Sequence, residues 1–227
     1  MSPVRIGAVT IGQSPRDDVV PELSILFGSG VEIVQRGALD NTSLQQIREN
    51  TPVSAETTLV SRMRDGAEVQ IDRGFVVPRL QSAICALEDN VRLILVLCSA
   101  SFDDLDSKVP LLRPSFALDN IVSQSRAHRL GVLTPSLEQV PAQRVRWQGF
   151  AEEEGVVLAA SPYVDRRVLE DAATELAHNE VDLVVMDCIG YTESMRQRLD
   201  RMLSVPVVSA LGALASTAVE TLDSGFS

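Results

Sequence analysis

Two cysteines in this sequence stand at the ends of similar apolar segments. Cys98 ends VRLILVLC (91–98) and Cys188 ends VDLVVMDC (181–188), so the two segments match at an offset of 90 residues. A loop follows each cysteine, and loop N–H groups or a helix N-terminus can lower a thiol pKa toward neutrality. A thiolate in that position can act as a general base. We therefore predict that Cys98 and Cys188 are catalytic, although free cysteines are also frequent in hydrophobic cores.

A pair of thiols on opposite faces of one carbon atom has a specific use. One thiolate removes a proton α to a carboxyl or carbonyl group, and the opposing thiol returns a proton to the other face. Backbone N–H groups and hydroxyls stabilise the enediolate that forms, and the reaction needs no metal and no cofactor. Candidate substrate-binding residues follow the predicted strand ends at Ser99, Ala100, Ser101, Thr134, Pro135, Ser136, Gly190, Tyr191 and Thr192.

The third cysteine has a different environment. Cys85 lies in LQSAICALEDN with Leu80, Ile84 and Leu87 at helical spacing, which is typical of the buried face of a helix. We therefore predict that Cys85 is a core residue without a catalytic role.

A loop with anion-binding character follows the first apolar run, in GQSPRDD (12–18). Ser14 and Asp17 resemble a capping box, and Pro15 suits the first position of a helix. A helix N-terminus favours an anion, and Arg16 could grip a carboxylate with two hydrogen bonds. We predict that Gln13, Ser14 and Arg16 hold a substrate carboxylate. The alternative is a capped helix whose Arg16 pairs in solvent with the neighbouring aspartates.

Apolar runs and helical patterns alternate along the chain. The apolar runs predict strands at 4–11, 31–35, 92–97, 130–134, 156–160, 182–187 and 205–208. The helical patterns lie at 15–27, 75–89, 115–126, 138–154, 166–179, 192–203 and 209–222. Strands apolar on both faces suit parallel sheets covered by helices, so we expect an α/β doubly wound fold with ligands beyond the carboxyl ends of the strands. In 57–73 two alternating runs flank Asp65–Gly66, which predicts a β-hairpin inserted into the first half.

The two halves of the sequence resemble each other. RIGAVT (5–10) matches RLGVLT (129–134) at an offset of 124, in the same order as the match that contains the cysteines. Each of these runs is followed by a Val–Pro pair that could open a helix, Val20–Pro21 and Val140–Pro141. The two offsets differ by 34 residues (124 − 90), and the predicted hairpin region accounts for about half of this extra length. We therefore expect a two-fold internal repeat.

Composition excludes several classes of function. The 227 residues carry a net charge of −11, and aromatic residues make up 4%, which argues against a nucleic acid or an anionic membrane as partner. Three cysteines are no disulfide framework, and we find no signal peptide or membrane span. His128 and His178 lie far apart, so a zinc site is not expected. Neither G-x-S-x-G, G-x-G-x-x-G nor a P-loop occurs. We expect a cytoplasmic protein that acts on a small carboxylate-bearing substrate.

TIGQSPRDD (10–18), LTPSLEQVPAQ (133–143) and VVMDCIGY (184–191) resemble the AroM family. More distantly, the chain is similar to the aspartate/glutamate/hydantoin racemase superfamily, which also contains maleate isomerases and arylmalonate decarboxylases. This resemblance implies two flavodoxin-like lobes related by a pseudo-dyad, with an active-site cleft between them. It implies lobes at 1–113 plus 206–227 and at 114–205, because the last helix returns to the first lobe. It also implies a homodimer, and Cys98 and Cys188 match the paired catalytic cysteines.

The sequence departs from the racemase pattern at two points. Ile189 follows the second cysteine, where the superfamily often has a hydroxyl or amide residue. Amino-acid racemases carry an acidic residue and a serine just after the first strand, whereas this chain has Gln13 and Ser14, and a cation at Arg16. A substrate without an amine is therefore favoured. We expect a cofactor-independent racemase, isomerase or decarboxylase acting at the carbon α to a carboxylate. The alternatives are a non-catalytic protein that binds or senses a small anion, and a structural component of an oligomer.

Overall fold

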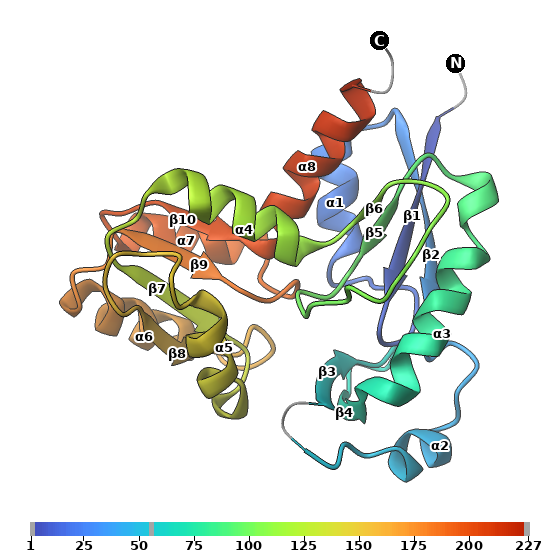
Figure 1. Cartoon of the computed structure of the whole chain (residues 1–227), viewed down its shortest axis with the longest axis horizontal. Helices are drawn as coiled ribbons and strands as arrows, with labels where there is room; N and C mark the ends of the chain where they lie inside the picture. The colour runs from blue at the N-terminus through green and yellow to red at the C-terminus, as the bar shows by residue number, and fades with distance from the viewer. Residues whose placement is uncertain (1–2, 55–56, 225–227) are drawn as a thin grey trace. The chain divides into compact units, whose positions relative to one another are not determined.

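Each half of the chain is built on a four-stranded parallel sheet of its own (Figure 1). The computed structural model describes residues 3–54 and 57–224. The chain divides into two compact units, Met1–Arg113 with Ala215–Ser227, and Pro114–Leu214, which we call the first and the second lobe. Parallel sheets covered by helices in two lobes confirm the predicted fold class.

The sheet of the first lobe has the strand order β2-β1-β5-β6. Its strands are β1 (Val4–Thr10), β2 (Val31–Gly37), β5 (Ile94–Val96) and β6 (Leu111–Leu112). The helices between them are α1 (Val20–Phe27), α2 (Leu44–Glu49) and α3 (Arg73–Cys85), followed by a 3₁₀ turn η2 (Glu88–Asn90). Of the inner strands, β5 is fully buried and β1 is buried from Ile6 onward, as expected for a parallel sheet between helices.

The second lobe repeats this plan with the strand order β10-β9-β7-β8. Its strands are β7 (Leu130–Thr134), β8 (Val156–Ala159), β9 (Leu183–Met186) and β10 (Val207–Ser209). Its helical elements are α4 (Pro114–Ser125), η3 (Leu137–Gln139), α5 (Val140–Trp147), α6 (Arg167–His178), α7 (Glu193–Met202) and the start of α8 (Ala210–Ser224).

The strand registers of the two sheets are equivalent. Gly7 of β1 pairs with Ile94 of β5, and Gly131 of β7 pairs with Val184 of β9. These pairs reproduce both sequence offsets, 124 residues for the first strand and 90 residues for the strand before each cysteine. The internal repeat is therefore present in the structure, and Cys98 and Cys188 occupy equivalent positions in their lobes.

A glycine in the first strand of each lobe leaves room for side chains of neighbouring elements. A Cβ atom on Gly131 would lie 2.8 Å from a methyl carbon of Leu176 in α6, and one on the equivalent Gly7 would lie 3.0 Å from Ile94. The helices α1 and α5 begin at the Val–Pro pairs, at Val20 and Val140, rather than at residues 15 and 138 where the helical patterns were predicted to begin.

The predicted hairpin is confirmed. β3 (Thr58–Arg62) and β4 (Glu68–Asp72) pair in antiparallel fashion around the Asp65–Gly66 turn. Gly66 has φ +88°, a conformation that a residue without Cβ adopts readily, and the Asp65 carboxylate accepts the N–H of Ala67 at 2.9 Å.

Some boundaries differ from those predicted. The helix expected at 138–154 ends at Trp147, and β6 and α2 were not predicted. We expected the second lobe to end at residue 205, but β10 pairs with β9 from Val207 onward and the lobe extends to Leu214. Only the part of α8 from Ala215 belongs to the first lobe.

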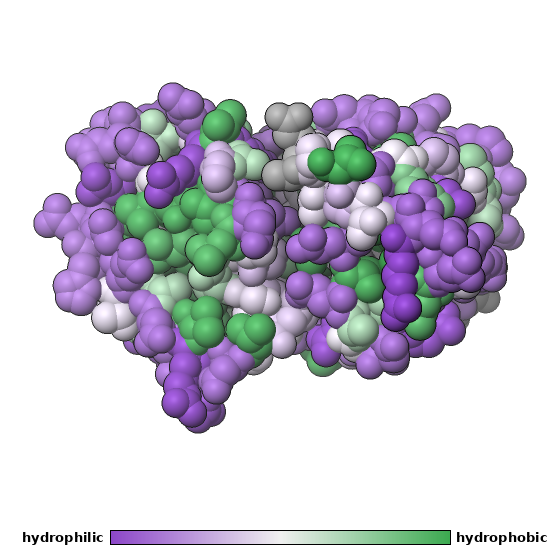
Figure 2. Space-filling view, turned by 90° about the horizontal axis from the view of Figure 1, so that it is seen from below, coloured by the Kyte–Doolittle hydropathy of each residue, from purple (hydrophilic) through white to green (hydrophobic). Residues whose placement is uncertain are grey.

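Hydrophilic residues cover much of the face shown in Figure 2, with hydrophobic residues gathered in patches. The most exposed large apolar side chains of the second lobe include Leu137 and Val145. Within the described ranges, no helix combines the length and the apolar character needed to cross a bilayer.

Candidate functional site

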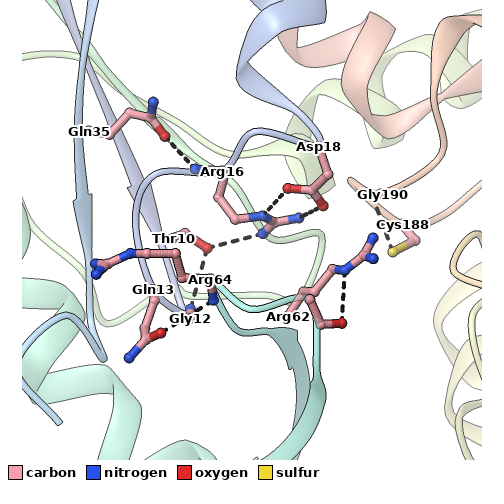
Figure 3. A network of polar contacts seen from close by, with 11 residues as sticks. Thr10, Gly12, Gln13, Arg16, Asp18, Gln35, Arg62, Arg64, Cys188 and Gly190 are labelled. Atoms are coloured by element: carbon pink, nitrogen blue, oxygen red, sulfur yellow. Dashed lines mark hydrogen bonds and ion pairs between the residues drawn. The ribbon is translucent and has the colours of Figure 1, made fainter.

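The loop that follows β1 contains a buried arginine (Figure 3). Arg16 is 4% exposed and forms a two-pronged ion pair with Asp18, Nε to Oδ1 at 2.7 Å and a terminal nitrogen to Oδ2 at 2.8 Å. Its other terminal nitrogen donates to the Thr10 hydroxyl at 3.1 Å, and its backbone N–H donates to the Gln35 side chain at 2.8 Å. The side chain is thus held at the carboxyl ends of β1 and β2.

The Arg16–Asp18 pair keeps the carboxylate charged. Burial raises the pKa of Asp18, but hydrogen bonding and charge from Arg16, aided by the charge of Arg62, lower this pKa below its ordinary value. Arg16 therefore pairs with a neighbouring aspartate, as the alternative interpretation expected, but this pair is buried and not in solvent. That Arg16 also holds a substrate carboxylate stays a prediction.

The predicted capping box at Ser14 and Asp17 is wrong. The helix α1 begins at Val20, its N-cap is Val19, and no side chain caps it. Ser14 instead donates its N–H (2.6 Å) and its hydroxyl (2.8 Å) to the two carboxylate oxygens of Asp40. Ser14 is therefore hydrogen-bonded to the loop after β2, and no helix begins at this residue.

The inserted hairpin adds two cations beside this loop (Figure 3). Nε of Arg64 donates to the Ser14 carbonyl at 2.7 Å, and its backbone N–H donates to the Gln13 side chain at 3.3 Å. Arg62 lies close enough to Asp18 to lower its pKa. The structure thus brings the predicted residues Gln13, Ser14 and Arg16 together with two hairpin arginines.

Cys98 lies beyond the carboxyl end of β5, the strand beside β1. It is half-buried and packs on the hydrophobic core of the first lobe. Ser99 and Ala100 are half-buried, whereas Ser101 is exposed and its carbonyl accepts a hydrogen bond from Arg73 at 2.6 Å. Arg73, the first residue of α3, thus anchors the loop that contains the predicted substrate-binding residues.

Cys188 has the same place after β9 in the second lobe and is also half-buried. The backbone N–H of Gly190 donates to its sulfur at 3.4 Å, a contact that stabilises negative charge on the sulfur. A Cβ atom at Gly190 would collide with the hydroxyl of Tyr163. Glycine therefore allows both the close approach of this ring and the turn that returns an N–H to the thiol.

The other predicted residues of the second lobe have structural partners. Tyr191 is fully buried and donates to the Ala160 carbonyl at 2.6 Å. Burial, and then the charges of Cys188 and Asp187, raise the pKa of Tyr191 well above its ordinary value, so the phenol stays neutral. Thr192 caps α7.

Thr134 ends β7 next to the Cys188 loop. Its hydroxyl is buried and donates to the side chain of Gln139 at 3.0 Å. Pro135 and Ser136 follow it and are half-buried. The predicted residues of this lobe thus meet at the carboxyl ends of the neighbouring strands β7 and β9.

Asp187 is the main residue of the second lobe that sequence analysis missed. Its side chain is fully buried and accepts from Arg146 at 2.8 Å and from the indole N–H of Trp147 at 3.1 Å. Arg146 also pairs with Asp119 of α4 at 2.6 Å. This network ties α4 and α5 to the residue that precedes Cys188. No local pattern signals it, because the equivalent residue of the first lobe is Leu97.

The first lobe contains missed residues as well. Asp40 and the hairpin arginines have no sequence signal, because their partners lie 26 to 51 residues away. Thr10 could have been found, because the offset of 124 makes it the equivalent of Thr134.

The interpretation of Cys85 as a core residue is wrong. Leu80, Ile84 and Leu87 are buried as expected, but Cys85 is the last residue of α3 and its side chain is exposed. The thiol accepts a contact from Gln81 at 3.4 Å. In the part of the chain that the structure describes, no group of three or more His, Cys, Asp or Glu side chains is arranged to hold a metal ion.

Comparison with known proteins agrees with this architecture. The maleate cis-trans isomerase of Nocardia farcinica is 17% identical, with 97% of this chain and 92% of that chain covered at a TM-score of 0.66. The allantoin racemase of Pseudomonas fluorescens (15% identity, 98% and 92% covered, TM-score 0.64) and the aspartate racemase of Picrophilus torridus (13%, 97% and 94%, 0.63) are similarly related. At these identities the likeness establishes the fold.

Among curated sequences, the (R,R)-butanediol dehydrogenase of Bacillus subtilis (strain 168) is 25% identical over 119 residues. The match includes 52% of this chain and 34% of the dehydrogenase, so the chain spans about a third of the length of that relative. The family described as AroM protein matches residues 6–222, nearly the whole sequence. The chain therefore belongs to the AroM family and has the fold of the racemases and isomerases named above.

Proposed function

We propose that this protein is a cofactor-independent enzyme that acts at the carbon α to a carboxylate of a small acid, as a racemase, an isomerase or a decarboxylase. The observation that carries the proposal is the equivalence of Cys98 and Cys188. Each follows the third strand of its sheet by the same number of residues, because the registers Gly7–Ile94 and Gly131–Val184 repeat at the sequence offsets. A core cysteine would have no reason to recur at the ligand-binding end of both sheets.

The proposed chemistry is a pair of proton transfers. In a racemase, the thiolate of one cysteine takes the α-proton, and the electron pair of the broken C–H bond moves into the carboxyl group as an enediolate. The thiol of the other cysteine then donates its proton to the opposite face, which forms the new C–H bond. In a decarboxylase the enediolate forms by loss of carbon dioxide, and one thiol is sufficient to protonate it.

The surroundings of each thiol support these roles. The Gly190 N–H that contacts the Cys188 sulfur favours a thiolate there. In the first lobe, Gln13 and Ser14 lie in a loop flanked by guanidinium groups, and guanidinium is suited to bind a carboxylate. We infer that this loop receives the carboxylate that stays bound while the α-carbon reacts.

A solved relative gives independent support for cysteine chemistry on this fold. A serine-for-cysteine mutant of the Nocardia farcinica maleate cis-trans isomerase contains a covalently bound succinylcysteine intermediate. In the present chain guanidinium, hydroxyl and amide groups lie at the loop after β1, and the two half-buried carboxylates there, Asp18 and Asp40, already pair with Arg16 and Arg64. Neither carboxylate is therefore assigned to a substrate amine, and the proposed substrate class is a dicarboxylic or hydroxy acid without an amine.

The test is hydrogen exchange in deuterated water. Purified protein is incubated with malate, 2-methylsuccinate, phenylmalonate or maleate, and ¹H NMR follows loss of the α-proton signal, loss of carboxylate or conversion to fumarate. We expect at least one acid to react, and we expect Cys188→Ala and Cys98→Ala to slow the reaction by about 100-fold or more, the range of general acid–base catalysis.

Cys85→Ala is the matched control, because it removes an exposed thiol from the same chain. Its rate should equal that of the unmodified protein. If no acid reacts, or if Cys85→Ala and Cys188→Ala react equally fast, the proposal is refuted. Saturable binding of an acid without turnover would instead indicate the alternative function, a protein that binds or senses a small anion.

A further inference from the structure

The first lobe contains a cavity that the proposed reaction does not use. It has a volume of about 550 Å³, within the range of small-molecule sites. Its lining residues come from the carboxyl end of β2, the segment that follows it, and the helices α2 and α3. Its walls include the polar side chains Asn41, Thr42, Gln46 and Ser82, and two arginines, Arg36 and Arg79.

The two arginines differ from most others in the chain. Arg16, Arg73 and Arg146, for example, each form an ion pair with an aspartate. Among the described residues, neither Arg36 nor Arg79 contacts a carboxylate. Arg79 donates to the carbonyl of Phe75 in its own helix and stacks on the Phe75 ring, with 3.5 Å from the guanidinium carbon to the ring centroid.

One carboxylate lines the cavity, and it is already occupied. Asp40 accepts hydrogen bonds from the N–H and hydroxyl of Ser14 and from the N–H of Gly37, all at 2.6 to 2.8 Å. Asp40 also pairs with Arg64 of the hairpin, from a terminal nitrogen to Oδ1 at 3.6 Å, so its charge is shared with a cation outside the cavity lining. Two guanidinium groups and one shared carboxylate line the cavity, which leaves a local positive potential in a protein of net charge −11.

We propose that this cavity binds a small anion whose carboxylate or phosphate group is held by Arg36 and Arg79. Guanidinium groups bind both of these anions through paired hydrogen bonds, and the lining hydroxyls and amides supply further donors. The residues that line the anion site do not include the loop after β1, although Asp40 contacts both.

The position of Asp40 links the two places. Gly37 and Asp40 line the cavity, and Asp40 also holds Ser14 in the candidate catalytic loop. An anion beside Arg36 and Arg79 adds negative charge to the cavity that Asp40 also lines, so its binding changes the field at the carboxylate that fixes Ser14. The anion is therefore expected to act as an effector of the loop.

The experiment is calorimetric titration of the full chain with inorganic phosphate and, separately, with succinate, at low ionic strength. We expect saturable binding of at least one of them. Arg36→Gln combined with Arg79→Gln should weaken it by about tenfold or more, as expected for loss of charged hydrogen bonds. Arg48→Gln is the matched control, because it removes the same charge from an exposed position of the first lobe outside the cavity lining.

A second variant keeps the charges and removes the space. Ala86→Trp introduces a large side chain at an exposed residue of the cavity wall, and it should weaken binding to the same extent. The combination of Cys98→Ala with Cys188→Ala should bind the anion as tightly as the unmodified chain, which separates this site from the proposed reaction. Absence of saturable binding, equal loss in Arg48→Gln, or full binding by Ala86→Trp would each overturn the inference.

Discussion

Replacement of Arg146 by methionine tests whether the buried network next to Cys188 organises the second lobe. The change keeps the apolar stem of the side chain and removes the guanidinium that contacts Asp187 at 2.8 Å and Asp119 at 2.6 Å. The Asp187 side chain is fully buried, so its carboxylate loses a charged partner where water cannot replace it.

The magnitude follows from the burial of the two partners. Breaking a buried pair by removing one member costs about 3–5 kcal/mol. The second pair adds less than about 1 kcal/mol, because the Asp119 side chain is 34% exposed and its charge is screened by solvent. For a chain of this size, a loss of about 3–5 kcal/mol lowers Tm by roughly 6–20 °C.

The loss should depend on pH in a defined direction. Burial raises the pKa of Asp119 above its ordinary value, against the opposing charge of Arg146. Without Arg146 this pKa rises further, so the charged carboxylate opposes folding until it is protonated. The stability difference between Arg146→Met and the unmodified chain should therefore shrink as the pH falls below neutrality through the raised pKa of Asp119.

The assay is urea unfolding followed by circular dichroism at pH 7 and pH 5. Arg144→Met is the matched control, since Arg144 is an exposed residue of the same helix, and its cost should stay within about 0.5 kcal/mol. If Arg146→Met is no less stable than Arg144→Met, the network contributes nothing to folding and the reasoning fails.

Three further predictions follow from contacts in the two lobes. Asp18→Asn leaves the buried Arg16 without its carboxylate and should lower the free energy of unfolding by about 3–5 kcal/mol at pH 7. Because the pKa of Asp18 is lowered in the folded protein, the stability difference should vanish as the pH falls through this lowered pKa. Acid unfolding of both proteins measures this difference. Glu152→Gln should lower the pKa of His128 in an NMR titration, because the hydrogen bond that the His128 ring donates to the Glu152 carboxylate is the main cause that raises this pKa. An unchanged pKa would contradict the assigned contact. Gly190→Ala should slow alkylation of the Cys188 thiol relative to that of the exposed Cys85, because the added methyl group collides with a tyrosine hydroxyl and displaces the N–H from the sulfur. Equal alkylation rates of Cys188 before and after the change would show that this N–H does not stabilise the thiolate.

The strands and the repeat could be predicted because their signals are local. Runs such as RLILVL and DLVVMD are short and apolar on both faces, which is typical of strands at the centre of a parallel sheet. The Val–Pro pairs marked the first turns of α1 and α5 because proline at a helix start loses no hydrogen bond. The hairpin was recognisable from Asp65–Gly66, since the turn needs a residue that tolerates positive φ.

The candidate site could be predicted only in part. Ser14 followed by Asp17 has the residue types of a capping box, but Asp40 takes both hydrogen bonds of Ser14 from 26 residues away. The face of α3 was assigned correctly except at Cys85, which lies at the end of the helix where the core no longer covers it.

Most of the strands, the internal repeat and the matching positions of Cys98 and Cys188 follow from the sequence alone. Hydrophobic periodicity is a property of neighbouring residues, and the repeat can be read by aligning one half of the sequence with the other. The partners of the charged side chains were decided by the tertiary structure. Arg16 pairs with Asp18 in a buried position rather than in solvent. Arg64 donates to the carbonyl of Ser14, 50 residues away in the sequence, and Arg146 donates to Asp187, 41 residues away. Electrostatic pairing depends on distance and burial in space, and these exist only once the strands have brought distant segments to the same end of a sheet.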